Sequence, residues 1–110
     1  MYTKNKCCAK LFDGVKMKKI RESEIELYFC WVVEVNGGKT WKFMSPAQRG
    51  VADRIACLPD GSTWFVELKT CGGRLAPLQK MFGEDMVRLN QKYAVLWTKE
   101  QIDNWIKETK

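Results

Sequence analysis

Residues 53–69 read Asp-Arg-Ile-Ala-Cys-Leu-Pro-Asp-Gly-Ser-Thr-Trp-Phe-Val-Glu-Leu-Lys, and this stretch decides the fold. Strand-forming residues dominate both of its halves, 53–58 and 62–69. In the turn 59–61, proline presets φ for the first position, aspartate suits the second, and glycine accepts a positive φ. This order predicts a hairpin with a three-residue loop, a type I turn followed by a glycine bulge.

The loop length sets which residues of the hairpin face each other. A three-residue loop places Leu58 opposite Ser62, and therefore Asp53 opposite Glu67. Directly opposed residues share a face of the sheet, and Lys69 lies on the same face because it is two residues beyond Glu67. A two-residue loop would shift the pairing by one and turn the two acids to opposite faces. The longer loop predicts two carboxylates and one ammonium group side by side, which can bind a divalent metal ion and activate water.

An aspartate followed by Glu-x-Lys is a weak motif by itself, and an ordinary surface hairpin would look the same. Three further features favour a site. Gly50, three residues before the aspartate, permits close backbone approach. Phe65 and Val66 place Glu67 at the end of an apolar strand, where a lone charge is costly. Gln79 follows near the start of an expected helix.

Three segments resemble the VRR-NUC domain (virus-type replication-repair nuclease), a branch of the PD-(D/E)XK phosphodiesterases. They are residues 50–55 (Gly-Val-Ala-Asp-Arg-Ile), 65–70 (Phe-Val-Glu-Leu-Lys-Thr) and 75–79 (Leu-Ala-Pro-Leu-Gln). The resemblance covers about residues 20–106, with the motifs in the right order and spacing. One departure is Ala52, where the family usually has a proline that shapes the backbone and binds no metal.

The resemblance implies a function as well as a fold. It implies a Mg²⁺- or Mn²⁺-dependent DNA endonuclease acting on branched DNA such as Holliday junctions, in repair or recombination. Standalone members of the family are small viral or bacterial proteins that work as homodimers, so the cytoplasm of the host cell is the expected location. Two rivals stay open: a non-catalytic basic module that binds nucleic acid, and a small interaction domain whose charge serves solubility.

Composition agrees with a nucleic-acid partner. The chain has 110 residues, net charge +6 and a pI near 9.1, which suit one compact basic domain. Solubility alone could also explain the charge. No run of eighteen apolar residues occurs, so we expect no membrane span.

The chain has no histidine, which excludes histidine-based zinc sites and Ser-His or Cys-His nucleophile pairs. Its five cysteines are odd in number and form no C-x-x-C motif, so we expect free thiols in a reducing compartment. Cys30 and Cys57 lie in apolar segments and are expected in the core. Cys71 adjoins the proposed site, but no histidine is present to activate it as a nucleophile.

We expect residues 1–19 to form a basic arm or a short added element, and residues 20–110 to form a single domain. Within the domain the pattern predicts an αβββαβα order, an α/β restriction-endonuclease-like core with a mixed sheet flanked by helices. The expected elements are a largely buried helix over 21–36, strands over 40–44, 53–58 and 62–69, a helix from Pro77 to about Asn90, a strand over 92–97, and a last helix capped by Thr98 with Gln101.

The first helix can supply a third acid. Glu22 and Glu26 lie one turn apart on it, and an acid on a buried helix near Asp53 would complete a metal site. The resemblance favours Glu26, because the Ile25-Glu26 pair matches the family's helical glutamate; Glu22 is the alternate. An exposed Glu26 paired with a lysine is the simpler alternative.

The roles then follow from chemistry. Asp53, Glu67 and Glu26 offer hard oxygen ligands for Mg²⁺ or Mn²⁺. Lys69 can orient the water and stabilise the developing anion, and Gln79 can hydrogen-bond the water or Lys69. Trp41 and Trp64 are expected in the core rather than as base-stacking platforms. The candidate phosphate contacts are Arg49, Arg54, Arg74, Lys80 and Arg88.

Overall fold

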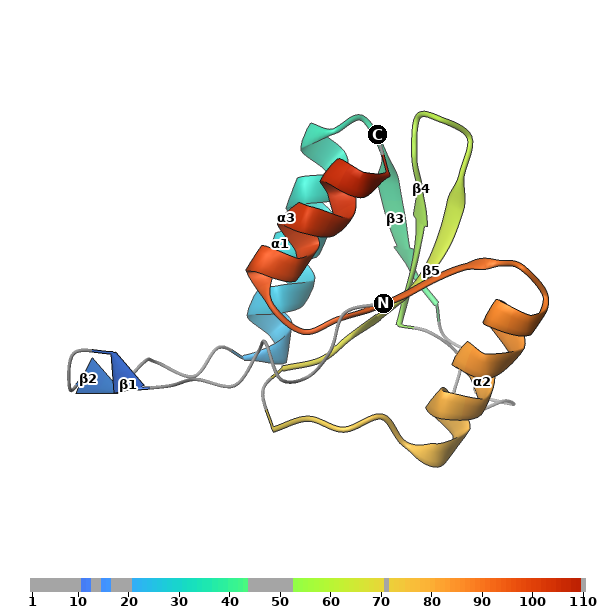
Figure 1. The fold of residues 1–110 in the computed structure, drawn as a ribbon. Coiled ribbons are helices and arrows are strands. Elements are labelled where there is room, and N and C mark those ends of the chain that lie inside the picture. Colours follow the sequence, from blue (N-terminus) through green and yellow to red (C-terminus); the bar gives the residue numbers. More distant parts are fainter. Residues whose placement is uncertain (1–10, 13–14, 17–20, 44–52, 71, 110) are drawn as a thin grey trace.

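The computed structural model describes residues 11–12, 15–16, 21–43, 53–70 and 72–109. Its elements are β1 (Leu11–Phe12), β2 (Val15–Lys16), α1 (Glu22–Val35), β3 (Lys39–Lys42), β4 (Arg54–Cys57), β5 (Thr63–Leu68), α2 (Pro77–Arg88), β6 (Lys92–Leu96) and α3 (Lys99–Glu108). From α1 onward the order is αβββαβα, as the sequence predicts. The short pair β1 and β2 precedes it (Figure 1). None of the described helices is long and apolar enough to cross a bilayer.

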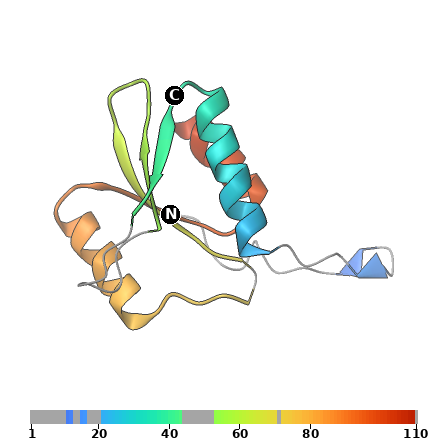
Figure 2. The same ribbon diagram turned by 180° about the vertical axis from the view of Figure 1, so that it is seen from behind.

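The main sheet is mixed and has the order β3-β4-β5-β6. The first three strands pair antiparallel, and β5 pairs parallel with β6. A parallel pair needs a crossover connection, and α2 supplies it. Helices α1 and α3 lie side by side against one face of the sheet, and α2 lies apart from them beside β6 (Figures 1 and 2). The chain is therefore an α/β protein with a mixed sheet flanked by helices.

The β4–β5 hairpin has the predicted register. The Leu58 amide donates to the Ser62 carbonyl at 2.9 Å, and Gly61 has a φ of +89°. Arg54 pairs with Val66, so the next position outward places Asp53 opposite Glu67. The three-residue loop is confirmed, and the shifted register is wrong.

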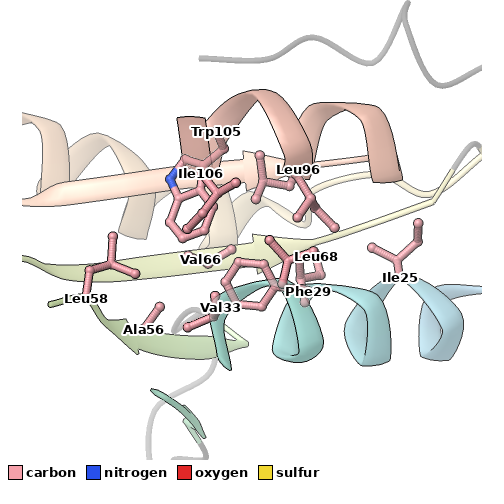
Figure 3. Packing of buried hydrophobic residues seen from close by; sticks show 13 residues of the cluster. Ile25, Phe29, Val33, Ala56, Leu58, Val66, Leu68, Leu96, Trp105 and Ile106 are labelled. Atoms are coloured by element: carbon pink, nitrogen blue, oxygen red, sulfur yellow. The ribbon is translucent and has the colours of Figure 1, made fainter. Parts of the chain in front are cut away.

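The hydrophobic core lies between the sheet and the pair α1 and α3 (Figure 3). Phe29 of α1 contacts Trp105 of α3, with ring centroids 5.3 Å apart. Val66 and Leu68 of β5 point into this core because alternate strand residues share a face. The opposite face of the sheet carries Phe65 and Glu67, and it is the face near α2. Phe65 contacts Phe82 of α2 with ring centroids 5.9 Å apart.

Helix α1 is less buried than its composition suggests. Its inner stripe (Ile25, Phe29, Val32 and Val33) is buried, but Leu27, Trp31 and Val35 form an exposed stripe, with Trp31 58% exposed. Only one side of the helix meets the sheet and α3, so apolar residues on its outer side stay exposed. The helix ends at Asn36, and Gly37 follows with a φ of +88°, as the glycine pair predicts.

Three other expectations about the core need correction. Trp41 is 48% exposed because β3 is an edge strand whose outer side has no covering element in the described part of the chain. Cys30 and Cys57 are only half-buried free thiols, with Cys30 accepting a hydrogen bond from Thr40. Trp64, in contrast, packs against the core as expected.

Helix α3 begins at its predicted cap. The Thr98 hydroxyl accepts a hydrogen bond from the Gln101 amide at 3.0 Å. The Gln101 side chain reaches back to the amide of Trp97 at 2.8 Å, one residue before the position that a capping box requires. The expected apolar stripe of this helix, Ile102, Trp105 and Ile106, is buried.

Candidate active site

Asp53 and Glu67 meet on the face of the sheet near α2. Asp53 precedes β4, and its Oδ2 accepts a hydrogen bond from the Leu68 amide at 3.1 Å. This bond fixes one carboxylate beside the strand that carries the other. The hairpin therefore brings the two acids together, and Lys69 follows directly at the end of β5, with its amide bonded to Leu96 of β6 at 3.0 Å.

Glu67 is a buried carboxyl group with one unsatisfied oxygen. The residue is 0% exposed, its Oε1 accepts a hydrogen bond from Gln79 at 2.9 Å, and its Oε2 has no partner among the described residues. Burial, together with the neighbouring Asp53, raises the pKa of Glu67 to about 9, although the charge of Lys69 acts to lower it. A buried acceptor without a partner is costly, and a proton or a bound cation would satisfy it.

Gln79 joins α2 to the site. Pro77 occupies the first turn of the helix, where its missing N–H costs nothing. The Gln79 Oε1 accepts from the Ala76 amide at 2.8 Å, and its Nε2 donates to Glu67. We expected Gln79 to contact water or Lys69, and instead it bonds the buried carboxyl group directly.

Glu26 and Arg54 pair with each other on the other side of the sheet. Arg54 lies opposite Val66, so its side chain is on the face that α1 covers, where it forms a salt bridge with Glu26. Asp53 and Glu67 are on the opposite face. The structure therefore does not bring the expected third ligand, Glu26, to the two acids, and it gives Arg54 a carboxylate partner.

Glu22, the alternate acid, is electrostatically closer to the site. It begins α1 with an exposed side chain, and its charge contributes to the raised pKa of Glu67, whereas Glu26 makes no such contribution. The alternation of side chains along the strands explains why Glu26 and Glu22 differ, because the two acids of the hairpin lie on the sheet face that α1 does not cover. A residue in the middle of α1 meets the core face, but the first turn lies at the end of the helix and is not confined to that face.

The donor atoms of Asp53 and Glu67 are of the kind that binds a hard divalent cation. Asp53 and Glu67 offer carboxylate oxygens, and the unpartnered Oε2 of Glu67 is the atom that a cation would satisfy. No group of three acids or cysteines comes together as a complete metal site within the described ranges. Two carboxylates are thus in place, and a third ligand for a cation here would have to come from a side-chain movement, the substrate or water.

The expected phosphate contacts separate into groups. Arg74, Lys80 and Arg88 are exposed, and the last two are on α2. Arg88 also contacts Asp85 at 3.2 Å. Four residues that we expected at or near the site lie outside the described residues: Arg49, Gly50, Ala52 and Cys71.

Tyr93 is a neighbour of the site that the sequence pattern did not single out. Burial, together with the negative charges of Glu67 and Asp53, raises the pKa of Tyr93 to about 12. Its hydroxyl is buried without a partner in the described part of the protein. From the sequence, Tyr93 reads only as a residue of a buried strand, because the register of a parallel pair cannot be derived from a turn.

Comparison with known proteins identifies the family. No protein-family model matches the chain. A protein of Acyrthosiphon pisum secondary endosymbiont phage 1, named "Putative nuclease p44", is 44% identical over 63 residues, which are 57% of this chain and 68% of the relative. A solved structure described as a VRR_NUC domain superposes with a TM-score of 0.74 and 26% identity, over 78% of this chain and 94% of the other. The protein therefore belongs to the VRR-NUC family of nucleases.

Proposed function

We propose that this nuclease is a metal-dependent DNA endonuclease that hydrolyses phosphodiester bonds at the Asp53–Glu67 site. The observation that carries the proposal is the buried, unpartnered Oε2 of Glu67 beside a second carboxylate. An isolated pair of acids in that position is costly unless a proton or a cation neutralises it. Mg²⁺ or Mn²⁺ is the class of ion that carboxylate oxygens select.

Each residue of the site has a distinct task. Asp53 and Glu67 would hold the cation, which when bound lowers the pKa of a water molecule and neutralises phosphate charge. The Leu68 amide fixes the orientation of Asp53, and Gln79 fixes that of Glu67. Lys69 adds a positive charge that favours ionised Glu67 and stabilises the charge that develops on the phosphate.

Glu22 is the acid of α1 that we assign to the cation, in place of Glu26. Its charge reaches Glu67, while Glu26 is held by Arg54 on the other face of the sheet. Because the side chain of Glu22 is exposed, it can change rotamer when an ion binds. Arg54 then has a structural role, and the exposed Arg74, Lys80 and Arg88 remain as phosphate contacts.

The same proposal includes a substrate class and an oligomeric state. Branched DNA, including Holliday junctions formed in repair or recombination, is the substrate class that the family resemblance implies. A homodimer in the cytoplasm of a phage-infected or bacterial cell fits that role. The exposed stripe Leu27, Trp31 and Val35 on α1 is apolar surface of the kind that a second copy would cover.

A cleavage panel tests the function. Linear, flapped and four-way DNA substrates are incubated with Mg²⁺, with Mn²⁺ or with a chelator, and products are resolved on denaturing gels. We expect cleavage with either ion, none with the chelator, and preference for a branched substrate. Metal-independent binding with no cleavage of any substrate would instead identify a non-catalytic DNA-binding module.

Salt dependence tests the phosphate contacts. Three neutralised phosphates would give a slope of roughly −2 to −3 for log affinity against log salt concentration. We expect Lys80→Gln to lower that slope by about 1, measured by fluorescence anisotropy with labelled DNA and a chelator. Lys107→Gln is the control, because Lys107 is an exposed cation on α3. Flat binding from low to moderate salt would contradict the prediction, and an absence of DNA retention at physiological salt would favour the small interaction domain.

A further inference from the structure

A hollow of about 580 Å³ lies between α2 and β6, on the same sheet face as the two acids. Its walls are largely apolar and include Leu75, Val87, Val95 and the ring of Tyr93. Volumes of ~300–1,000 Å³ with apolar walls and a few polar groups are typical of sites for small organic ligands. Lys80 and Arg88, proposed above as phosphate contacts, lie at its boundary, and no role has been assigned to its apolar interior.

The hollow directly adjoins the catalytic strand. Val95 in its wall is the β-sheet partner of Glu67, and adjacent strands lie about 4.8 Å apart. Tyr93 connects the two regions electrostatically, since the charges of Glu67 and Asp53 reach it. Lys80, also in the lining, follows Gln79 in α2. A ligand in the hollow would therefore lie next to the position of the reacting phosphate.

Gly83 lines the hollow at the point where α2 approaches Tyr93 most closely. A Cβ at this position would lie 2.7 Å from Cε2 of Tyr93 and 3.0 Å from its hydroxyl oxygen. Because glycine has no side chain, the backbone of α2 packs directly against the tyrosine ring. The ring also meets Phe82, with centroids 6.1 Å apart. This packing holds the aromatic wall in place.

The charges around the hollow indicate the kind of ligand. Lys80 and Arg88 line it two helical turns apart, so an apolar interior has cations at two points of its boundary. An apolar planar group attached to an anionic chain matches that arrangement. Glu84, between the two cations in sequence, offers an acceptor for an exocyclic amino group. A nucleotide within a DNA strand combines all three properties.

We propose that the hollow binds the base of an unpaired nucleotide that flanks the scissile phosphate. The inference rests on the DNA endonuclease function proposed above, and it gives that function a requirement for a base out of the duplex. Lys80 and Arg88 hold the phosphates on either side, while the base lies against Val87 and Tyr93. Branch points and frayed ends present such nucleotides at the lowest cost of unpairing.

The test uses DNA duplexes with one unpaired nucleotide at a fixed branch point, which sets the register, and an abasic site replaces in turn the unpaired nucleotide or one of its neighbours. Binding is measured with a chelator present, so the readout does not require cleavage. We expect one abasic position to weaken binding about five- to a hundredfold, the range of a lost base contact. Val87→Trp, which fills the hollow, should bind weakly and equally to all duplexes in the series.

Met81→Trp is the matched control, because Met81 and Val87 are both on α2 and both 57% exposed. Met81 lies outside the hollow, so this variant should keep the abasic effect. An abasic series without effect, or a Val87→Trp variant that still discriminates, would overturn the proposal even if cleavage persists. If binding depends on the abasic position but the protein cleaves no DNA, the base-binding site is supported and the proposed nuclease mechanism is contradicted. A hollow that serves only as an interface between copies would show itself if Val87→Trp changed the sedimentation of the protein without altering the abasic effect.

Discussion

Replacing Glu67 with glutamine is expected to reduce DNA cleavage by about 1,000-fold or more and, in the same protein, to stabilise the metal-free fold. Cleavage falls because an amide is a poor ligand for a hard cation and contributes no charge to it. The fold gains because glutamine reproduces the protonated acid. Its carbonyl oxygen can accept from Gln79, and its amide nitrogen can donate toward Asp53. Stability is measured by urea unfolding with a chelator present.

The stability gain should depend on pH in a defined direction. Burial raises the pKa of Glu67 to about 9 in the folded protein, from 4.5 in the unfolded chain. The folded state therefore keeps a proton that the unfolded state has lost, and the native protein loses stability as pH rises from about 4.5 to about 9. The glutamine variant lacks this loss, so its advantage should grow over that range and reach at most about 5 kcal/mol near pH 8.

Metal binding gives an independent reading of the same proton. A cation binds the ionised carboxylate, so binding below pH 9 should release close to one proton and tighten as pH rises. Calorimetry in buffers of different ionisation enthalpy measures this release. Glu34→Gln, at an exposed carboxylate of α1, should change neither cleavage nor the pH profile. A Glu67→Gln protein that cleaves normally, or that is less stable than the parent at pH 8, would contradict the assignment of Glu67.

The hairpin shows which part of the site was predictable from sequence. Pro59, Asp60 and Gly61 define the turn by local backbone preferences, and the turn defines the register. The opposition of Asp53 and Glu67 follows without any knowledge of the rest of the fold. Element order was predictable for a similar reason, since helical and strand periodicity and the caps at Asn36 and Thr98 are local features.

The contribution of α1 was not predictable in the same way. Periodicity shows that a helix has an apolar side, but it does not show how much of that side another element covers. Trp31 is exposed for this reason, although the sequence pattern places it on the apolar face. The rotation of the helix about its axis also decides which acid meets which strand. Glu22 and Glu26 share one stripe of α1. Glu26 forms a salt bridge with Arg54, which lies on the sheet face opposite the two acids of the hairpin.

Glu22→Gln is expected to reduce cleavage by about 100-fold, with a change in unfolding free energy of less than about 1 kcal/mol. The residue is exposed in the first turn of α1, where an acid stabilises the helix by only ~0.3–1 kcal/mol through the helix dipole. In the proposed site it would complete the ligands of a cation held by Asp53 and Glu67, so its removal should weaken metal binding and cleavage together. Metal titrations of the cleavage rate and urea unfolding measure the two effects.

Glu26→Gln should have the opposite pattern. Its carboxylate pairs with Arg54, whose side chain is 19% exposed and whose Nε already lacks a partner among the described residues. Loss of the carboxylate leaves a largely buried guanidinium without its counter-charge, which should cost about 1–3 kcal/mol of stability. Cleavage at saturating metal should change less than about threefold, because no ligand of the cation is lost. If Glu26→Gln instead abolishes cleavage in a protein of normal stability, and Glu22→Gln is active, the helical ligand is Glu26 and the salt bridge to Arg54 must open when the cation binds.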